Sequence, residues 1–249
     1  MTMKFNNETV GVCAEIAIAD VYGIPVDSDF RWRGDEDIID SLKNPIKKAF
    51  ESEELSAPVE YVGESQNEID FIQESGETLS VKTNQKWEGR TCPQKVGQST
   101  YNTFAKNLLL EAKKSPEKNK SLIEQLKNCP EDTRGKIEHY KDTVYYFPHK
   151  VIPIMIANLL NCDNLAHITN VVRENKEPTG RPRIRVIKKS DVKGFKRDDF
   201  SFTSEREDWD ESITIKYKGW SVVNAQAHKK RKGTKLRFNE GALEILLGQ

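Results

Sequence analysis

The sequence has little cysteine, no long apolar run and no excess of either charge. Its four cysteines, Cys13, Cys92, Cys129 and Cys162, include no C-x-x-C pair. This spacing predicts reduced thiols in a cytoplasmic protein rather than a disulfide framework or a zinc site. No stretch of about 18 apolar residues occurs, so we expect no membrane-spanning helix and no membrane partner.

Motifs for nucleotide binding and serine chemistry are missing as well. The chain has no Walker loop and no G-x-G-x-x-G after a predicted strand, which predicts that it uses no nucleotide cofactor. It has no G-x-S-x-G elbow, which leaves a serine hydrolase without support. Histidine occurs four times, at His139, His149, His167 and His228, and this scattered set is more typical of structural residues than of a zinc site.

The balanced composition conceals a strong polarity along the chain. Lys and Arg number 39, as do Asp and Glu, yet residues 1–80 carry a net charge of −12. Residues 81–175 carry +5 and residues 176–249 carry +7, and the segment 216–237 holds eight basic residues and no acid. The balance of charges excludes a protein that coats DNA with a basic surface along its whole length. The pattern predicts a surface for a polyanion in the C-terminal part, and the acidic N-terminal third could hold a cation.

The hydrophobic pattern predicts helices first and strands later. Apolar residues recur at helical spacing over 8–22, and four further segments read as helices: 35–53 with a break near Pro45, 99–114, 117–128 and a short one at 240–247. Val151–Leu160 is the most apolar stretch, so it predicts a core element. Alternating residues predict strands at 183–187, 213–217 and 235–238. The order predicts an α+β or α/β fold around one sheet.

Two short β-prone runs, 69–72 and 79–83, flank the turn-forming residues 74–77 and predict a hairpin. Side chains alternate between the two faces of a strand, so Ser80 and Lys82 share one face. A loop with an odd number of residues, which Ser75-Gly76 permits, places Asp70 on that face too; an even loop places it on the other.

Such a hairpin could carry metal-dependent phosphodiester chemistry. Asp70 and the carbonyl of Val81 are oxygen ligands of the kind that Mg²⁺ prefers. Lys82 would position or help to deprotonate an attacking water, and the metal would polarise the phosphate. The competing interpretation is a solvated cross-strand ion pair between Asp70 and Lys82, which is common and weak.

The pattern Asp70…Ser80-Val81-Lys82 resembles the active-site motif of the PD-(D/E)xK nucleases. It departs from that motif at Ser80, where the usual residue is Asp or Glu. It is similar to a subset of small type II restriction endonucleases that cut short GC-rich palindromes and carry a polar amide residue there. The segments 82–85 and 93–98 also resemble parts of some restriction endonucleases. The resemblance implies a central mixed sheet flanked by helices, Mg²⁺ as cofactor and double-stranded DNA as substrate.

Serine at position 80 leaves the cation one negative charge short, so another acid should compensate. Glu15, on the first predicted helix, is the first candidate, because the resembled family often places a glutamate near the metal there. Glu68 would share the face of Asp70, and Glu60 lies further along the chain. Glu15 could instead face solvent on an amphipathic helix. The predicted catalytic set is Asp70, Ser80, Lys82 and Glu15, and the predicted metal ligands are Asp70, Val81 and Glu15.

Contacts to DNA are expected from basic and amide side chains. Asn224, Gln226 and His228 can read base edges, and the neighbouring Lys229-Lys230-Arg231-Lys232 cluster contacts phosphates or is a solvated loop. Arg181, Arg183 and Arg185 form either a phosphate track or a soluble sheet face. The full candidate set comprises Lys86, Arg90, Arg181, Arg183, Lys218, Asn224, Gln226, His228, Lys229, Lys230, Arg231 and Lys232.

We therefore expect one nuclease domain, residues 1–249, with a catalytic part at 1–175 and a basic, β-rich, DNA-contacting part at 176–249. The predicted function is that of a type II restriction endonuclease acting as a monomer or homodimer. Two alternatives remain: a repair or nicking nuclease with the same chemistry, and a non-catalytic DNA-binding protein in which the hairpin is structural.

Overall fold

The structure of the chain is a computed structural model that describes residues 7–63, 69–85, 89–93, 95–173, 175–189, 194–228 and 233–248. It contains helices and two sheets, which confirms the expected mixed α and β class but not the expected single sheet. The chain divides into two compact units: unit 1 is 1–89 with 160–189, and unit 2 is 90–159 with 190–249. Alternating patterns identify strands but not their neighbours, so they could not show which strands share a sheet.

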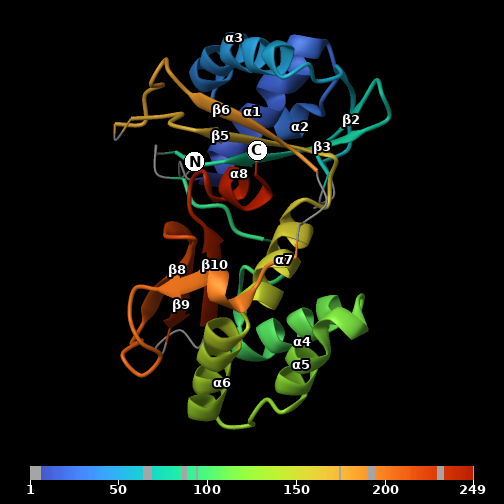
Figure 1. Cartoon of the computed structure of the whole chain (residues 1–249). Helices are drawn as coiled ribbons and strands as arrows, with labels where there is room; N and C mark the ends of the chain where they lie inside the picture. Colours follow the sequence, from blue (N-terminus) through green and yellow to red (C-terminus); the bar gives the residue numbers. More distant parts are fainter. Residues whose placement is uncertain are drawn as a thin grey trace. The chain divides into compact units, whose positions relative to one another are not determined.

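Unit 1 is built on a mixed sheet with the strand order β1-β2-β3-β5-β6, in which only β3 and β5 run parallel. Helices α1 and α3 pack together and contact strands of this sheet (Figure 1). The elements of unit 1 are, in chain order, α1 (Asn7–Tyr22), α2 (Ser28–Arg31), α3 (Glu36–Ser52), β1 (Pro58–Tyr61), β2 (Phe71–Gln73), β3 (Thr78–Thr83), β5 (Asn164–Thr169) and β6 (Arg183–Lys188).

The core of unit 1 forms between the two helices and one face of the sheet. Helix α1 is apolar on most of its sides, and α3 buries one apolar stripe. From the sheet come Phe71, Leu79, Val81, Ala166 and Ile168, all at most 6% exposed. These residues alternate with the polar residues of β3 and β5. Hydrophobic burial therefore fixes which face of the sheet the polar residues occupy.

Helix α3 runs through Pro45 without the break expected from the sequence. Proline lacks a backbone N–H and normally interrupts an interior turn. Here Leu42 and Ile46, on either side of it, are fully buried against α1 and the sheet, as is Phe50 one turn later. Burial of about 2 kcal/mol per large apolar side chain offsets the loss of one hydrogen bond, so the helix continues.

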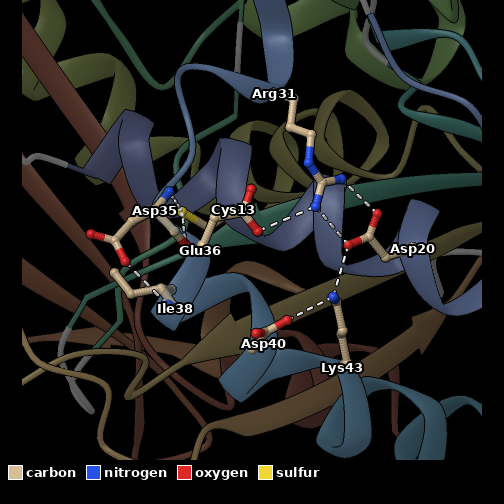
Figure 2. Close-up of polar contacts among 8 residues, drawn as sticks. All are labelled: Cys13, Asp20, Arg31, Asp35, Glu36, Ile38, Asp40 and Lys43. Carbon is tan, nitrogen blue, oxygen red and sulfur yellow. Dashed lines mark hydrogen bonds and ion pairs between the residues drawn. The ribbon is translucent and has the colours of Figure 1, made fainter. Parts of the chain in front are cut away.

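Polar contacts join the three helices of unit 1 (Figure 2). Arg31 on α2 makes two hydrogen bonds to Asp20 on α1, at 2.7 and 3.1 Å, and one of 3.2 Å to Glu36 on α3. Lys43 on α3 bridges Asp20 and Asp40 at 2.9 and 2.7 Å. Because these groups are part-exposed, each pair contributes only a fraction of about 1 kcal/mol. Their main effect is to fix the position of α1 relative to α2 and α3.

Cys13 and Asp35 add a second link between α1 and α3 (Figure 2). The backbone N–H of Asp35 donates to the Cys13 sulfur at 3.2 Å, and the Asp35 carboxylate caps α3 by accepting from the N–H of Ile38. Burial raises the pKa of the Cys13 thiol to about 11, so this cysteine is inert. All four cysteines of the chain are free, as expected.

Unit 2 is built on an antiparallel sheet with the strand order β4-β10-β9-β8-β7. Its elements are β4 (Gln98–Thr100), α4 (Tyr101–Ala112), α5 (Pro116–Lys127), α6 (Thr133–Tyr146), α7 (Pro148–Leu159), the 3₁₀ turn η2 (Arg197–Asp199), β7 (Phe200–Phe202), β8 (Ser212–Tyr217), β9 (Trp220–His228), β10 (Gly233–Phe238) and α8 (Ala242–Leu247). The apolar stretch at 151–160 forms most of the buried helix α7, as expected.

Aromatic residues organise the core of unit 2. Tyr140 on α6 is 1% exposed, and its ring contacts those of Phe104 and Trp209 at centroid distances of 4.9 and 5.8 Å. Helices α4 and α6 both contact the sheet. In the described part of the chain, no helix has the length and apolar character needed to cross a membrane.

Candidate active site

The expected hairpin is present, and its loop has the odd length that the site requires. Phe71 pairs with Leu79 and Ile72 with Thr78, and the N–H of Gln73 donates to the carbonyl of Glu77. Residues 74–76 form the loop, and Gly76 has a φ of 85°, which suits glycine. This register sets Asp70 opposite Ser80, because the N–H of Asp70 donates to the carbonyl of Leu79. Asp70, Ser80 and Lys82 therefore lie on one face.

A chain of hydrogen bonds joins the three polar side chains. Lys82 Nζ donates to Ser80 Oγ at 3.1 Å, and Ser80 Oγ donates to Asp70 Oδ2 at 3.1 Å. The Val81 N–H also donates to Asp70 Oδ2, at 2.6 Å. Ser80 thus connects the ammonium to the carboxylate. This is not the geometry of a solvated ion pair, since Asp70 and Ser80 are 7% and 1% exposed.

Burial dominates the electrostatics of Asp70. It raises the pKa of the carboxyl, whereas the Lys82 charge and the hydrogen bonds from Val81 and Ser80 act in the opposite direction. The half-buried Lys82 is the only cation among the causes of this shift. The carboxylate is therefore only partly compensated by its neighbours, and a further positive charge beside it would be stabilising.

Glu15 on α1 belongs to the same electrostatic cluster. Its Oε2 accepts a hydrogen bond of 2.7 Å from the hydroxyl of Tyr61, at the end of β1. Burial and the nearby Asp70 raise the pKa of Glu15 to about 7, against the opposing effects of Tyr61, Lys82 and Arg33. The structure thus brings together Glu15, Asp70 and Lys82, although 55 residues separate the first two in the sequence.

His167 extends the site along the sheet. Lys82 is paired with His167 of β5, and His167 with Arg185 of β6, so the three side chains form a row on one face. The His167 ring Nε2 lies 2.9 Å from Asn84 Oδ1. Burial and the Arg185 charge lower the pKa of His167 to about 4. The imidazole is therefore neutral at neutral pH and adds no charge beside Lys82.

The acidic ligands at this site are two carboxylates. No group of three or more His, Cys, Asp or Glu side chains able to hold a metal occurs among the described residues. Two carboxylates still fit Mg²⁺, which keeps several of its waters and is commonly held by one or two carboxylates together with substrate phosphates. The raised pKa values of Glu15 and Asp70 support this fit, because a bound cation would relieve the cost of burying their charges.

Three further candidates for the metal site are Glu60, Glu68 and Val81. Glu60 is exposed on β1, where it pairs with Ile72. Glu68 lies outside the described residues. Val81 is buried in the core of unit 1, and its N–H donates to Asp70 Oδ2, so its backbone adjoins the cluster.

The predicted DNA contacts are distributed over both units. Arg183, on β6, pairs with Thr169 of β5 on the face that carries Lys82, and Arg181 is exposed just before the strand. Lys218 lies in unit 2, at the β8–β9 turn with a φ of 48°, and its ammonium stands 5.2 Å from the ring centre of Tyr217. Lys86 and the basic cluster Lys229–Lys232 lie outside the described residues.

Four more candidates belong to unit 2. Asn224, Gln226 and His228 alternate along β9 and share one face. Arg90 Nη1 donates to Asn224 Oδ1 at 3.4 Å, and Arg237 Nη2 donates to the same oxygen at 3.2 Å. Asn224 is only 7% exposed. Its carbonyl oxygen thus contacts two arginines, a pairing that residue types alone did not suggest.

Sequence reasoning did not anticipate Tyr61 or His167 as neighbours of the site. Tyr61 is a single aromatic residue at a strand end, and no sequence signal connects it to Glu15. The scattered positions of the four histidines instead predict a structural role for His167. Its proximity to Lys82 follows from the parallel pairing of β3 with β5, which no local pattern encodes.

Comparison of the chain with models of protein families, with curated proteins and with solved structures gives no match. The geometry of the residues themselves therefore carries the functional argument.

Proposed function

We propose that the chain is a type II restriction endonuclease that hydrolyses phosphodiester bonds in duplex DNA at a short specific sequence, with Mg²⁺ as cofactor. The observation that carries the proposal is the chain of hydrogen bonds from Lys82 through Ser80 to Asp70, beside the part-buried carboxyl of Glu15. Lysine and carboxylates converge there on one small region of a sheet, which is the arrangement that metal-assisted hydrolysis of a phosphodiester requires.

The resemblance to PD-(D/E)xK nucleases supports the same conclusion. It implies a central mixed sheet flanked by helices, and unit 1 has a mixed sheet with α1 and α3 against one face. The motif lacks its second acid at Ser80. Glu15 is in position to compensate, because it interacts electrostatically with both Asp70 and Lys82.

Each residue has a distinct role in the proposed reaction. Asp70 and Glu15 would hold Mg²⁺, which supplies Lewis-acid charge to the scissile phosphate when bound. Lys82 orients the attacking water and stabilises charge that develops on the phosphate oxygens. Ser80 fixes the Lys82 ammonium by accepting its hydrogen bond, and its own hydroxyl donates a hydrogen bond to Asp70 Oδ2. Tyr61 holds the Glu15 carboxylate by donating to Oε2.

Digestion of a phage DNA of known sequence tests the proposal. Purified protein with Mg²⁺ should produce discrete bands on a gel, and a chelator should abolish them. Glu15→Ala should reduce cutting strongly, because one of the two carboxylates is lost. Lys48→Ala, an exposed lysine on α3, serves as the matched control and should cut like wild type.

The alternatives predict different gels. A repair or nicking nuclease would nick DNA at lesions and produce no discrete fragments from intact DNA. A non-catalytic DNA-binding protein would shift the mobility of the DNA without breaking it. Undamaged DNA that stays intact with Mg²⁺ would end the restriction proposal, and unchanged cutting by Glu15→Ala would remove Glu15 from the site.

A further inference from the structure

The helices of unit 2 enclose a pocket of about 490 Å³, which is within the range of ordinary small-molecule sites. Its walls come from the end of α4, the first turn of α5, one face of α7 and residues 194 and 195. Helix α4 packs against both α5 and α7 (Figure 1). All of these elements belong to unit 2, whereas the candidate active site is built from unit 1.

One face of α7 leaves space for the pocket because it lacks bulky side chains. His149, Pro153 and Ala157 are spaced four residues apart, so they lie on the same face of the helix. All three line the pocket; Pro153 is half-buried and Ala157 is exposed. The opposite side of α7 is buried in the core and includes Ile152 and Met155. The open face of α7 thus forms one wall of the pocket.

The first turn of α5 forms a second wall, which is fixed in place. Asn119 departs from helical geometry, with φ −115° and ψ 15°, and is 8% exposed. Its side-chain amide donates to the carbonyl of Ala112 at 3.1 Å, which ties the start of α5 to the end of α4. The wall is therefore preformed, and a preformed site loses less free energy to ordering when a ligand binds.

The lining carries an excess of positive charge. Lys118 and Lys150 both line the pocket, and Lys150 Nζ donates to the backbone carbonyl of Lys118 at 2.6 Å. A carbonyl is neutral, so this bond orients the ammonium without cancelling its charge. Glu111 is the one acid among the lining residues, and its carboxylate lies 2.6 Å from Lys114 Nζ. Within the described part of the chain, neither Lys118 nor Lys150 forms an ion pair.

The remainder of the lining is flat and largely apolar. Phe195 packs edge-on against Tyr217 with a centroid distance of 5.2 Å, so its ring is held in position. Burial and two nearby basic side chains lower the pKa of His149, so its imidazole is neutral at neutral pH and adds an uncharged ring. Pro153 and Ile154 supply aliphatic surface. Rings and aliphatic groups of this kind favour a ligand with a flat apolar body.

We propose that this pocket binds a small aromatic acid, whose ring lies against Phe195, Pro153 and Ile154 and whose acidic group contacts the ammonium groups of Lys118 and Lys150. Charge complementarity carries the choice of an anion, since the only acid of the lining is already paired with Lys114. Hydrogen bonds between an ammonium and a carboxylate are about twice as strong as neutral ones. The inference does not depend on the nuclease proposal.

A fluorescent aromatic anion tests the chemistry of the ligand. Anilinonaphthalene sulfonate joins aromatic rings to one negative group, and its fluorescence rises on apolar protein surface. The full-length folded chain should bind it saturably. Naphthoate should displace the probe, whereas naphthalenemethanol, which is similar in size but uncharged, should compete at least tenfold less well because it cannot form a charge-assisted hydrogen bond.

Two variants test the location of the site. Ala157→Leu fills the pocket from an exposed helix position, so it should lose one bound probe per chain and keep the wild-type melting temperature. Lys150→Gln should weaken the affinity about tenfold, because one charged donor is lost. Lys127→Gln, an exposed lysine further along α5, is the matched control and should bind like wild type. Wild-type binding in either pocket variant, equal displacement by naphthoate and the alcohol, or no saturable binding at all would overturn the inference.

Discussion

The two sheets of the molecule each have an apolar face and a polar face, but the polar faces carry opposite electrostatic imbalances. In unit 1 the carboxyls of the part-buried Glu15 and the buried Asp70 outnumber the nearby ammonium of Lys82, and burial raises their pKa values. In unit 2 Arg90 and Arg237 both donate to Oδ1 of Asn224, and burial together with the Arg90 charge lowers the pKa of Arg237. The first cluster gathers carboxylates, and the second gathers guanidinium groups.

The difference shows that two sheets, each with an apolar and a polar face, can gather side chains of opposite charge. Metal-assisted hydrolysis needs acids that hold a cation close to a lysine, and unit 1 supplies them from three elements, α1, β3 and the residue preceding β2. The polar face of unit 2, on which Asn224 lies, instead carries two arginines that are held by one amide oxygen. Four variants of unit 1 should therefore change cleavage or cation affinity through the cluster of Glu15, Asp70 and Lys82.

Lys82→Ala should have the largest effect. Loss of the group that positions and deprotonates water should lower single-turnover cleavage by about 10³-fold, within the range for general acid–base catalysis. Duplex affinity in chelator should change far less than cleavage, because Lys82 is one cation among the predicted DNA contacts of both units. Cleavage at the wild-type rate would exclude Lys82 from the reaction, and a loss of affinity as large as the loss of cleavage would mean that Lys82 acts through binding.

Glu15 should make the stability of the metal-free protein depend on pH. Its pKa in the folded state, about 7, exceeds the ordinary value of 4.5, so the folded protein holds an extra proton between these values. The free energy of unfolding of the wild type should therefore fall as pH rises through this window, by up to about 3 kcal/mol. Glu15→Gln should lack this loss in urea unfolding measured in chelator. Identical pH profiles would place Glu15 in solvent.

Mg²⁺ should stabilise the wild-type chain. A cation that binds only the folded state adds about 2.7 kcal/mol when its concentration is a hundred times its dissociation constant. The melting temperature should rise with Mg²⁺, more so above pH 7 where Glu15 has lost its proton. Asp70→Asn should remove the response, and Asn224→Asp, in the other sheet, should keep it. A rise in Asp70→Asn equal to that of wild type would mean that the cation binds elsewhere.

Tyr61→Phe should have the smallest effect. Its hydroxyl stabilises the charged form of Glu15, so its removal raises the pKa of that carboxyl further. Cleavage at neutral pH should fall about fivefold, equivalent to one hydrogen bond, and recover at higher pH. Tyr22→Phe, whose ring stacks on Phe50, is the control. A deficit that does not depend on pH would mean that Tyr61 acts through packing.

The hairpin of the candidate site was predictable because its determinants are local. The alternation of apolar residues over 69–72 and 79–83 defines the strands, and the glycine at position 76 allows the loop that puts Asp70 opposite Ser80. Glu15 could be selected only through the resemblance. His167 could not be selected at all, since its approach to Lys82 depends on a parallel pairing between distant strands.

The division of the chain was also beyond sequence reasoning. The expected parts were 1–175 and 176–249, whereas the chain passes from one compact unit to the other after residues 89, 159 and 189. Composition suggested a basic C-terminal part, but the polar face of unit 2 includes Gln98 and contacts Arg90, which come from the middle of the sequence. Charge counts along a chain do not show which segments a sheet brings together.

The parallel pairing of β3 with β5 has a consequence for the order in which the protein is synthesised. The ribosome releases the strand bearing Lys82 first, then all of residues 90–159, and only afterwards the strand that completes its other side. Contacts between such distant segments form late, because a long loop must close first. In a growing chain the sheet around Lys82 therefore stays incomplete until β5 has left the ribosome, and the proposed site cannot act before that point.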